Sequence, residues 1–203
     1  MSGNYFPATA NICKCRGAML IATGVHLVLS GEAGFGLSHP LDCSAYAIES
    51  AQGAVLFDCG SGADVGVVGV ALSRIGMPVK HVFLTHAHAD HSGGGRIIKA
   101  ATGAVFHAGE ATARIVSQGD RRAMSLDVAQ RAGVYPFDYQ FAPFEIDHLL
   151  SDGETMEIGG LHVLPVATPG HCADHISYLI EWPSCFIPDF DGGGHPRQGE
   201  IAA

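Results

Sequence analysis

The chain has 203 residues, enough for about one domain and for a core that buries ~70% of the surface of the unfolded chain. Its 47% of apolar and 15% of charged residues are typical of a globular protein rather than a disordered one. The net charge of −9, without a basic stripe, argues against a nucleic-acid partner, and no apolar run reaches the ~18–20 residues of a membrane helix. We expect one domain over residues 1–203 that acts on a small-molecule substrate away from membranes, with a homo-oligomer left open.

Six cysteines are scattered through the sequence without a C-x-x-C pair. A chain of this length does not need a disulfide framework, and free cysteine is among the most buried residue types, so we interpret most of them as reduced and buried. The apolar stretch 18–29 resembles the centre of a signal peptide, but His26 interrupts it and no clear A-x-A site follows. These features favour a cytoplasmic protein.

Apolar periodicity and turn residues predict strands that alternate with helices in the first part of the chain. The predicted strands cover 18–29 (two strands), 44–49, 54–57, 79–84 and 104–107. The predicted helices cover 64–75, 96–101 and 110–132, the last with a break near Gly119. Residues 133–150 contain two prolines and several aromatics and predict a packed loop, which is followed by hairpins at 156–167 and 176–187. This order predicts a mixed α/β architecture in layers.

The strongest chemical signal is the segment His86-x-His88-x-Asp90-His91, which directly follows the predicted strand 79–84. Side chains at i and i+2 of an extended backbone point to the same side, so His86 and His88 can converge on one metal ion. Asp90 and His91 lie where the chain turns toward three glycines, and they can aim at a second position a few ångström away. Three histidines and an aspartate at a strand end are far more typical of a functional loop than of a chance polar turn.

Two later positions extend this pattern. A Pro-Gly pair shapes a turn that can present His171, which becomes the natural third ligand beside His86 and His88. Three protein ligands and a water form the usual open catalytic zinc site. Asp189, preferred here over Asp191, follows a predicted strand, and a carboxylate between two metals can hold them ~3.5–4 Å apart.

These residues, in this order, make the chain similar to the metallo-β-lactamase-fold hydrolases over most of residues 18–191. The resemblance implies an α+β fold, a four-layer αββα sandwich with the site at one edge. It implies two metal positions, one formed by His86, His88 and His171 and the other by Asp90, His91 and the bridging Asp189. It also implies that Asp58, in the glycine-rich turn after the strand 54–57, orients a metal ligand.

Two positions depart from the family pattern. Pro188 stands where the family usually has glycine before the bridging aspartate, and it removes a backbone donor near the site. The family usually has a further histidine of the second metal tens of residues beyond this aspartate. Here only His195 follows, in a glycine-rich loop; it is the candidate substitute for that ligand, although a loop histidine is more often simply exposed. We therefore expect that the C-terminal part of the fold is incomplete, that a partner covers it, or that the second metal is weak or absent.

The resemblance implies one or two zinc ions per chain, with iron or manganese as alternatives. The metal would activate a water molecule, which Asp90 would orient for attack on a thioester, ester or lactone carbonyl. The stretch from His171 to Tyr178 resembles hydroxyacylglutathione hydrolases and related thioesterases, and His175 within it is interpreted as a supporting residue. No cluster of lysine and arginine suits the two carboxylates of glutathione, which disfavours that particular substrate.

Three alternatives remain open. The short C-terminus also suits a persulfide dioxygenase-like oxidoreductase with a single iron on His86, His88 and His171. A β-lactam hydrolase has the same fold, and an inactive truncated homologue would keep the motif without completing the fold. A metal analysis separates an iron enzyme from a zinc hydrolase.

Overall fold

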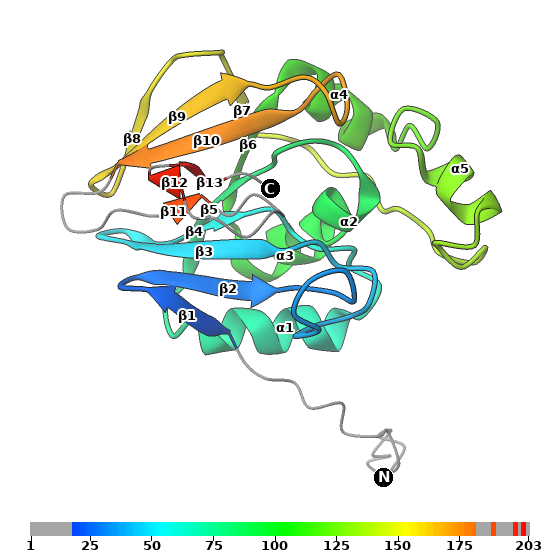
Figure 1. Cartoon of the computed structure of the whole chain (residues 1–203), viewed down its shortest axis with the longest axis horizontal. Helices are drawn as coiled ribbons and strands as arrows, with labels where there is room; N and C mark the ends of the chain where they lie inside the picture. Colours follow the sequence, from blue (N-terminus) through cyan, green and yellow to red (C-terminus); the bar gives the residue numbers. More distant parts are fainter. Residues whose placement is uncertain (1–17, 182–187, 190–196, 199, 202–203) are drawn as a thin grey trace, which may run out of the picture.

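The computed structural model describes residues 18–181 together with the short strands at 188–189, 197–198 and 200–201. Two β-sheets face each other across a hydrophobic core, and helices cover the outer face of the larger sheet (Figure 1). The described residues thus form three layers, and the outer helical layer of the expected αββα sandwich is not among them. Nor does this part of the chain contain a helix that is both long and apolar enough to cross a bilayer.

The larger sheet has seven strands whose spatial order follows the sequence. They are β1 (Met19–Ala22), β2 (Val25–Leu29), β3 (Ala45–Ser50), β4 (Gly53–Phe57), β5 (Val79–Phe83), β6 (Val105–Gly109) and β7 (His148–Leu150). Strands β1 to β4 pair antiparallel, whereas β4 to β7 pair parallel. Parallel strands end at the same edge of the sheet, and the chain leaves β4 and β5 there into the glycine-rich turn and the histidine motif.

The smaller sheet is antiparallel and has the order β13-β10-β9-β8. Its strands are β8 (Met156–Ile158), β9 (Leu161–Ala167), β10 (Ile176–Glu181) and β13 (Glu200–Ile201). A separate pair joins β11 (Pro188–Asp189) to β12 (Arg197–Gln198). Strands β9 and β10 begin their pairing with Ala167 opposite Ile176, and the loop between them carries His171.

The helices of the described residues are α1 (Val65–Arg74), α2 (Ala89–Ser92), α3 (Gly95–Thr102), α4 (Glu110–Gln118) and α5 (Leu126–Arg131). Apolar residues of α1, α3 and α4, such as Val68, Ile98 and Val116, share one core with the larger sheet. Helix α1 begins after Asp64, whose carboxylate accepts hydrogen bonds from two N–H groups of the first turn. Helix α2 lies inside the histidine motif.

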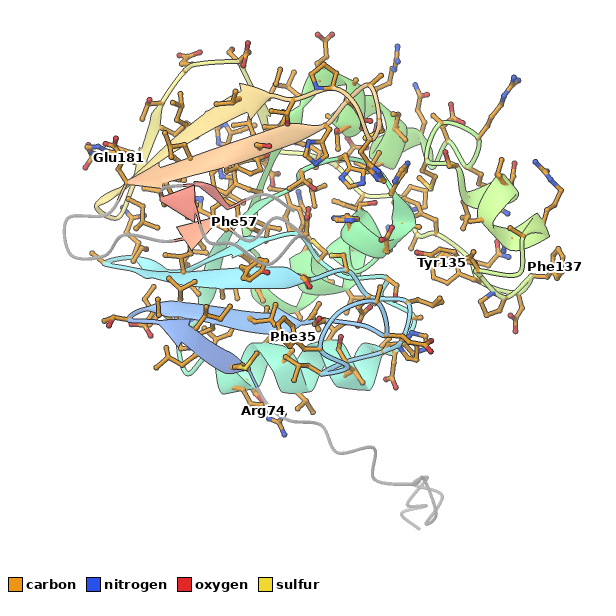
Figure 2. The ribbon with its side chains drawn as sticks, viewed as in Figure 1. Phe35, Phe57, Arg74, Tyr135, Phe137 and Glu181 are labelled. Atoms are coloured by element: carbon orange, nitrogen blue, oxygen red, sulfur yellow. The ribbon has the colours of Figure 1, made fainter. Side chains whose placement is uncertain are left out.

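A side chain and a backbone N–H of β10 join the smaller sheet to the segment that follows β5. The ring centroids of Phe57 on β4, labelled in Figure 2, and Tyr178 on β10 are 5.4 Å apart in the core between the sheets. The Tyr178 hydroxyl donates a hydrogen bond of 2.6 Å to the carbonyl of Leu84. The Ile176 N–H donates one of 2.9 Å to the carbonyl of Thr85. The two sheets are therefore joined directly beside the histidine motif.

Most of the predicted elements are confirmed, including helix α1, strands β3 to β6 and the β8–β9 hairpin. The prediction of a loop over the whole of 133–150 is wrong at its end, because His148–Leu150 form β7 and pair in parallel with β6. A run of three residues is too short to show the alternation that marks a strand. The predicted strand 185–187 lies outside the described residues.

Three imidazoles lie side by side on β5, β6 and β7. His107 is 2% exposed, its Nε2 is 3.0 Å from Nδ1 of His81, and its ring stacks on those of Phe83 and His148. Its Nδ1 is buried without a hydrogen-bond partner in the described part of the chain. Burial, reinforced by His81 and His148, lowers the pKa of His107 to about 4.

We expect His107 to make the fold less stable in acid. An unfolded histidine takes up its proton near pH ~6.5, whereas folded His107 does so only at a pH of about 4. The free energy of unfolding therefore falls as the pH drops from the first value to the second, and the loss is about 2–3 kcal/mol at pH ~4.5. His107→Leu should flatten this dependence, whereas His162→Leu, at an exposed histidine of β9, should not. Urea unfolding across this pH window measures the effect, and identical slopes for wild type and His107→Leu would contradict it.

Candidate metal centre

The histidine motif lies at the edge of the larger sheet where β4 and β5 end (Figure 1). Asp58 follows β4 directly, and His86 lies just beyond the end of β5. His88 is the N-cap residue of the four-residue helix α2, which carries Asp90 and His91. The backbone therefore changes from extended to helical at His88, which separates the first two side chains of the motif from the last two.

The structure brings His86, His88 and His171 together, and we call these three residues the three-imidazole cluster. One ligand atom of each lies within 4.8 Å of the other two, and Nε2 of His171 is 3.1 Å from Nδ1 of His88. The ring centroids of His86 and His171 are 5.1 Å apart. His86 is buried, His88 half-buried and His171 exposed, so the cluster opens to solvent on the His171 side.

The buried imidazole of His86 has one polar atom without a partner. Its Nδ1 is 2.9 Å from the Thr85 hydroxyl oxygen, whereas its Nε2 is buried and makes no hydrogen bond to the described residues. Burial, reinforced by His91 and His88, lowers the pKa of His86 far below its ordinary value, so this ring is neutral. A neutral imidazole with an unpaired Nε2, beside two more imidazoles, fits a transition-metal ion such as zinc.

Asp58 is the buried support of this edge of the sheet. It is 1% exposed and has a φ of 62°, in the left-handed region that is strained for residues other than glycine. Its carboxylate accepts hydrogen bonds from the N–H and hydroxyl of Thr85, and its Oδ2 is 2.8 Å from Nδ1 of His91. Asp58 thus contacts His91 directly and His86 through Thr85, and its expected role in orienting a metal ligand stays a prediction.

His91 lies next to the three-imidazole cluster. The ring centroids of His86 and His91 are 4.1 Å apart, and Nε2 of His91 is 3.4 Å from Oδ2 of Asp90. Burial acts to lower the pKa of His91, but Cys43 and Asp58 outweigh it and raise this pKa well above its ordinary value. The sequence did not reveal Cys43 as part of the site, because no motif surrounds it.

Asp174 is a positioning residue that sequence motifs did not reveal. Its Oδ2 accepts hydrogen bonds from the Ala87 N–H, at 3.1 Å, and from the Thr112 hydroxyl, at 2.8 Å. Ala87 stands between His86 and His88, so this carboxylate fixes the β9–β10 loop to the histidine motif. The signal that could have found it is its place in the loop that also carries the third imidazole.

We expect Asp174→Ala to lower the free energy of unfolding by about 1–3 kcal/mol, because the Ala87 N–H and the Thr112 hydroxyl lose their acceptor. Metal binding should weaken as well, since the loop is then held less firmly. The matched control is Asp138→Ala, at an exposed aspartate, which should change stability by no more than about 0.5 kcal/mol. Urea unfolding with and without zinc measures both effects, and a variant as stable as wild type would show that this bridge is dispensable.

The other expected residues fall into two groups. His175 lies beside the three-imidazole cluster: its Nδ1 is 2.8 Å from the Thr168 hydroxyl oxygen, and its ring centroid is 5.3 Å from that of His86. Asp189 belongs to β11, but its side chain is not described, and His195 lies outside the described residues altogether. The roles expected of Asp189 and His195 therefore stay predictions.

A cavity of about 320 Å³ lies beside the three-imidazole cluster, and we call it the cluster cavity. His88 and Asp90 border it, so a molecule inside would lie next to one imidazole of the cluster. The larger apolar residues of its wall, from the loop before β3 and the region of α5, are Leu41, Met124, Leu126, Val134 and Tyr135. No lysine or arginine of the described chain lines it.

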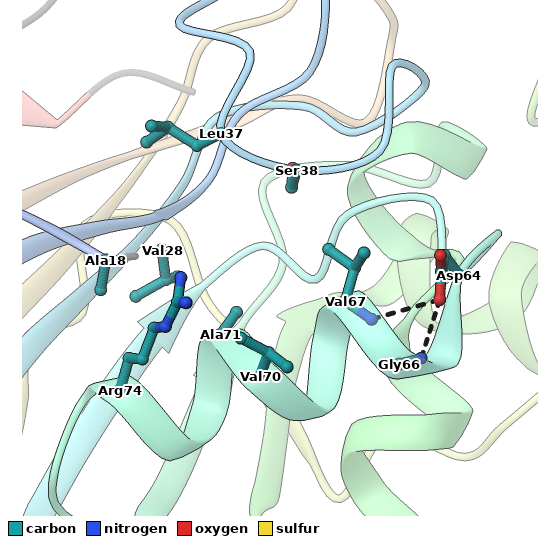
Figure 3. A pocket seen from close by; sticks show the side chains of 10 residues that line it. All are labelled: Ala18, Val28, Leu37, Ser38, Asp64, Gly66, Val67, Val70, Ala71 and Arg74. Atoms are coloured by element: carbon teal, nitrogen blue, oxygen red, sulfur yellow. Dashed lines mark hydrogen bonds between the residues drawn. The ribbon is translucent and has the colours of Figure 1, made fainter. Parts of the chain in front are cut away.

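A second cavity, of about 290 Å³, lies between α1 and the segments around it (Figure 3). Leu37 and Ser38 face Val67 of α1 across it. Among the described residues its wall holds no histidine or cysteine, and its carboxylate there, Asp64, accepts the hydrogen bonds at the start of α1. The described wall of this cavity offers no imidazole or thiolate to a metal ion, whereas the three-imidazole cluster offers three imidazoles, so that cluster is the candidate site.

The chain belongs to the metallo-beta-lactamase superfamily, whose family model matches residues 39–181, more than half of the sequence. Solved structures show the same fold. The metallo-beta-lactamase GOB-18 of Elizabethkingia meningoseptica aligns with a TM-score of 0.67 at 19% identity, over 100% of this chain and 67% of that one. A HARLDQ-motif mutant metallo-beta-lactamase of Cronobacter sakazakii aligns with a TM-score of 0.64 at 24% identity, over 82% and 60% of the two chains.

Curated relatives match the chain over part of their own length. A hydroxyacylglutathione hydrolase of Rhodopseudomonas palustris is 30% identical over 111 residues, which are 55% of this chain and 33% of that protein. The atrochrysone carboxyl ACP thioesterase of Aspergillus fumigatus is 25% identical over 154 residues, which are 75% of this chain and 30% of that protein. The chain therefore spans only about a third of the length of these relatives.

Proposed function

We propose that this chain is a metal-dependent hydrolase that cleaves a thioester, ester or lactone carbonyl with water. The observation that carries the proposal is the three-imidazole cluster, with the unpaired Nε2 of His86 and with His88 at the border of an apolar cavity. Membership of the superfamily supports hydrolysis, and the names of the two curated relatives denote thioester substrates.

In this proposal His86, His88 and His171 hold the metal, most simply zinc, with iron or manganese as alternatives. A bound divalent metal supplies a Lewis acid that polarises a carbonyl oxygen and makes water more acidic. Thr85 contacts Nδ1 of the His86 ring and leaves Nε2 without a partner, and a ligand atom of His86 lies within 4.8 Å of those of His88 and His171. Asp90 borders the same cavity, where its carboxylate can accept a proton from the attacking water.

The wall of the cluster cavity favours a substrate with an uncharged, apolar acyl group. Its charged groups, within the described chain, are the carboxylates of Asp42 and Asp90. A dianionic substrate such as a glutathione thioester would meet these carboxylates without a cation to offset them. An apolar acyl group would instead bury surface against side chains such as Leu41 and Met124.

Tyr135 is the residue that we expect to hold the substrate by a hydrogen bond. Its side chain lines the cluster cavity, and its hydroxyl is buried without a partner in the described residues, so we expect this side chain to turn toward a bound substrate. Tyr135→Phe should therefore lower kcat/KM roughly tenfold, the value of one hydrogen bond, with little change in Tm. Tyr139→Phe is the matched control, because its hydroxyl donates to the Ser61 carbonyl at 2.7 Å and should affect stability alone. Equal kinetic losses in both variants would contradict this role.

Hydrolysis by the full chain, after metal removal and reloading with zinc, manganese or iron, tests the proposed function. The panel contains neutral acyl thioesters, S-lactoylglutathione, aliphatic lactones and a chromogenic β-lactam. We expect turnover of the neutral carbonyl substrates, faster than that of S-lactoylglutathione. Removal of the metal by a chelator should abolish this turnover, and reloading with metal should restore it. If no carbonyl substrate is cleaved in a metal-dependent way, the proposal fails, and iron-dependent oxygen uptake with a persulfide would identify the oxidoreductase alternative.

A further inference from the structure

Cys43 lies outside the ligand set expected from the sequence but inside the site. Its backbone N–H donates a hydrogen bond of 3.2 Å to the carbonyl of Asp90, which fixes it beside α2. Its sulfur, an oxygen of Asp58 and a nitrogen of His91 all lie within 4.8 Å of one another. The described residues contain this group of potential metal ligands in addition to the three-imidazole cluster.

The Cys43 group adjoins the three-imidazole cluster. The rings of His86 and His91 have centroids 4.1 Å apart. The Thr85 hydroxyl oxygen lies between them, 2.9 Å from Nδ1 of His86 and 3.4 Å from Nδ1 of His91. Two neighbouring groups of ligand atoms are what a pair of metal ions requires.

The other described cysteines show that burial alone does not explain this placement. Cys59 is 0% exposed and packs in the hydrophobic core under the larger sheet. Cys172 follows His171 but joins no group of ligand atoms in the described chain. Cys43 is the described cysteine whose sulfur meets both an imidazole and a carboxylate.

We propose that Cys43 is a sulfur ligand of a second metal position, together with His91, and that the Asp58 carboxylate offsets the charge of the ion. This inference rests on the proposed metal-dependent function. It departs from the ligand set implied by the resemblance, in which Asp90 and Asp189 accompany His91. On binding, the thiol releases its proton to solvent and its sulfur bonds the ion as a thiolate. A thiolate ligand selects zinc or cobalt over manganese.

Cobalt substitution of the full chain tests the proposal by spectroscopy rather than by activity. Wild type should bind two cobalt ions, and filling of the second position should produce a thiolate-to-cobalt charge-transfer band in the near ultraviolet. Cys43→Ser should lose this band and bind the second ion at least about tenfold more weakly, with the first ion retained. Cys172→Ser, a thiol next to the cluster, is the matched control and should keep the band.

The proposal is overturned if Cys43→Ser keeps the band or if wild type binds two ions without it. Binding of a single ion also overturns it but leaves the proposed hydrolase intact, whereas binding of no ion removes both. If circular dichroism shows that Cys43→Ser does not fold, the NMR chemical shift of cadmium bound to wild type tests the proposal instead. Sulfur ligation moves this shift strongly downfield, and a shift typical of nitrogen and oxygen ligands alone refutes the assignment.

Discussion

Replacing His88 with alanine is expected to abolish metal-dependent hydrolysis while the chain still folds. His88 contributes one of three imidazoles, with Nδ1 only 3.1 Å from Nε2 of His171, so its loss leaves two ligands for the ion. We expect metal affinity and kcat/KM to fall at least about a hundredfold. The side chain is half-buried, so its removal opens no large cavity in the core. Elemental analysis of the purified variant, kinetics and thermal unfolding measure the three effects.

The matched control for His88→Ala is His162→Ala. His162 is an exposed histidine on β9, so this change removes an imidazole without touching the site. The control variant should keep its metal content, activity and Tm. Full hydrolytic activity in His88→Ala would show that the three-imidazole cluster does not hold the catalytic ion, and the proposed function would fall.

Asp58→Asn should have the second-largest effect on the metal. The carboxylate now accepts hydrogen bonds from Thr85 and from Nδ1 of His91, and an amide cannot offer two charged acceptor oxygens. We expect metal affinity to fall about 10–100-fold, because ligand orientation depends on such partners. A zinc titration with a competing chelator measures this loss, and an unchanged affinity would show that Asp58 does not orient the ligands.

A comparison of Asp58→Ala with Asp58→Asn separates the contribution of Asp58 to the stability of the fold from its contribution to metal binding. Asparagine tolerates the left-handed backbone found at position 58, whereas alanine does not, and alanine leaves the Thr85 N–H without its acceptor. We expect Asp58→Ala to lower the free energy of unfolding by about 3–5 kcal/mol and Asp58→Asn to cost clearly less. Urea unfolding of the two apo variants gives the comparison, and equal losses would show that the backbone conformation at Asp58 carries no strain.

Sequence motifs predict much of the site because several of its residues stand close together in the chain. His86 and His88 converge since they stand two positions apart at the end of a strand, which any extended backbone would achieve. Asp58 was implied by the family resemblance alone, and in the structure it follows β4, which pairs in parallel with β5. His171 needed more than local pattern, because only its order after the motif and the family resemblance pointed to it.

The parts that sequence did not predict depend on contacts between distant segments. Asp174 supports the motif through a hydrogen bond from the backbone N–H of Ala87. A backbone donor is present whatever residue stands at position 87, so the sequence gives no sign of this bond. Cys43 lies just before β3, and it is near His91 in the folded chain, in which β3 pairs with β4. A cysteine in this position is equally compatible with simple burial. The short strand β7 is fixed by its pairing with β6 rather than by its own pattern.

The hydrogen bonds that join β10 to the segment that follows β5 make one side of the site more rigid than the other. The carbonyls of Leu84 and Thr85 are held by Tyr178 and Ile176, so this stretch cannot detach unless the two sheets separate. Amide protons here should exchange with deuterated solvent only on global unfolding. The opposite wall of the cluster cavity includes the exposed Val134, which makes no hydrogen bond to the smaller sheet within the described residues. Ligands would therefore enter and leave past the exposed His171 and the exposed wall at Val134, while the stretch that carries His86 stays fixed.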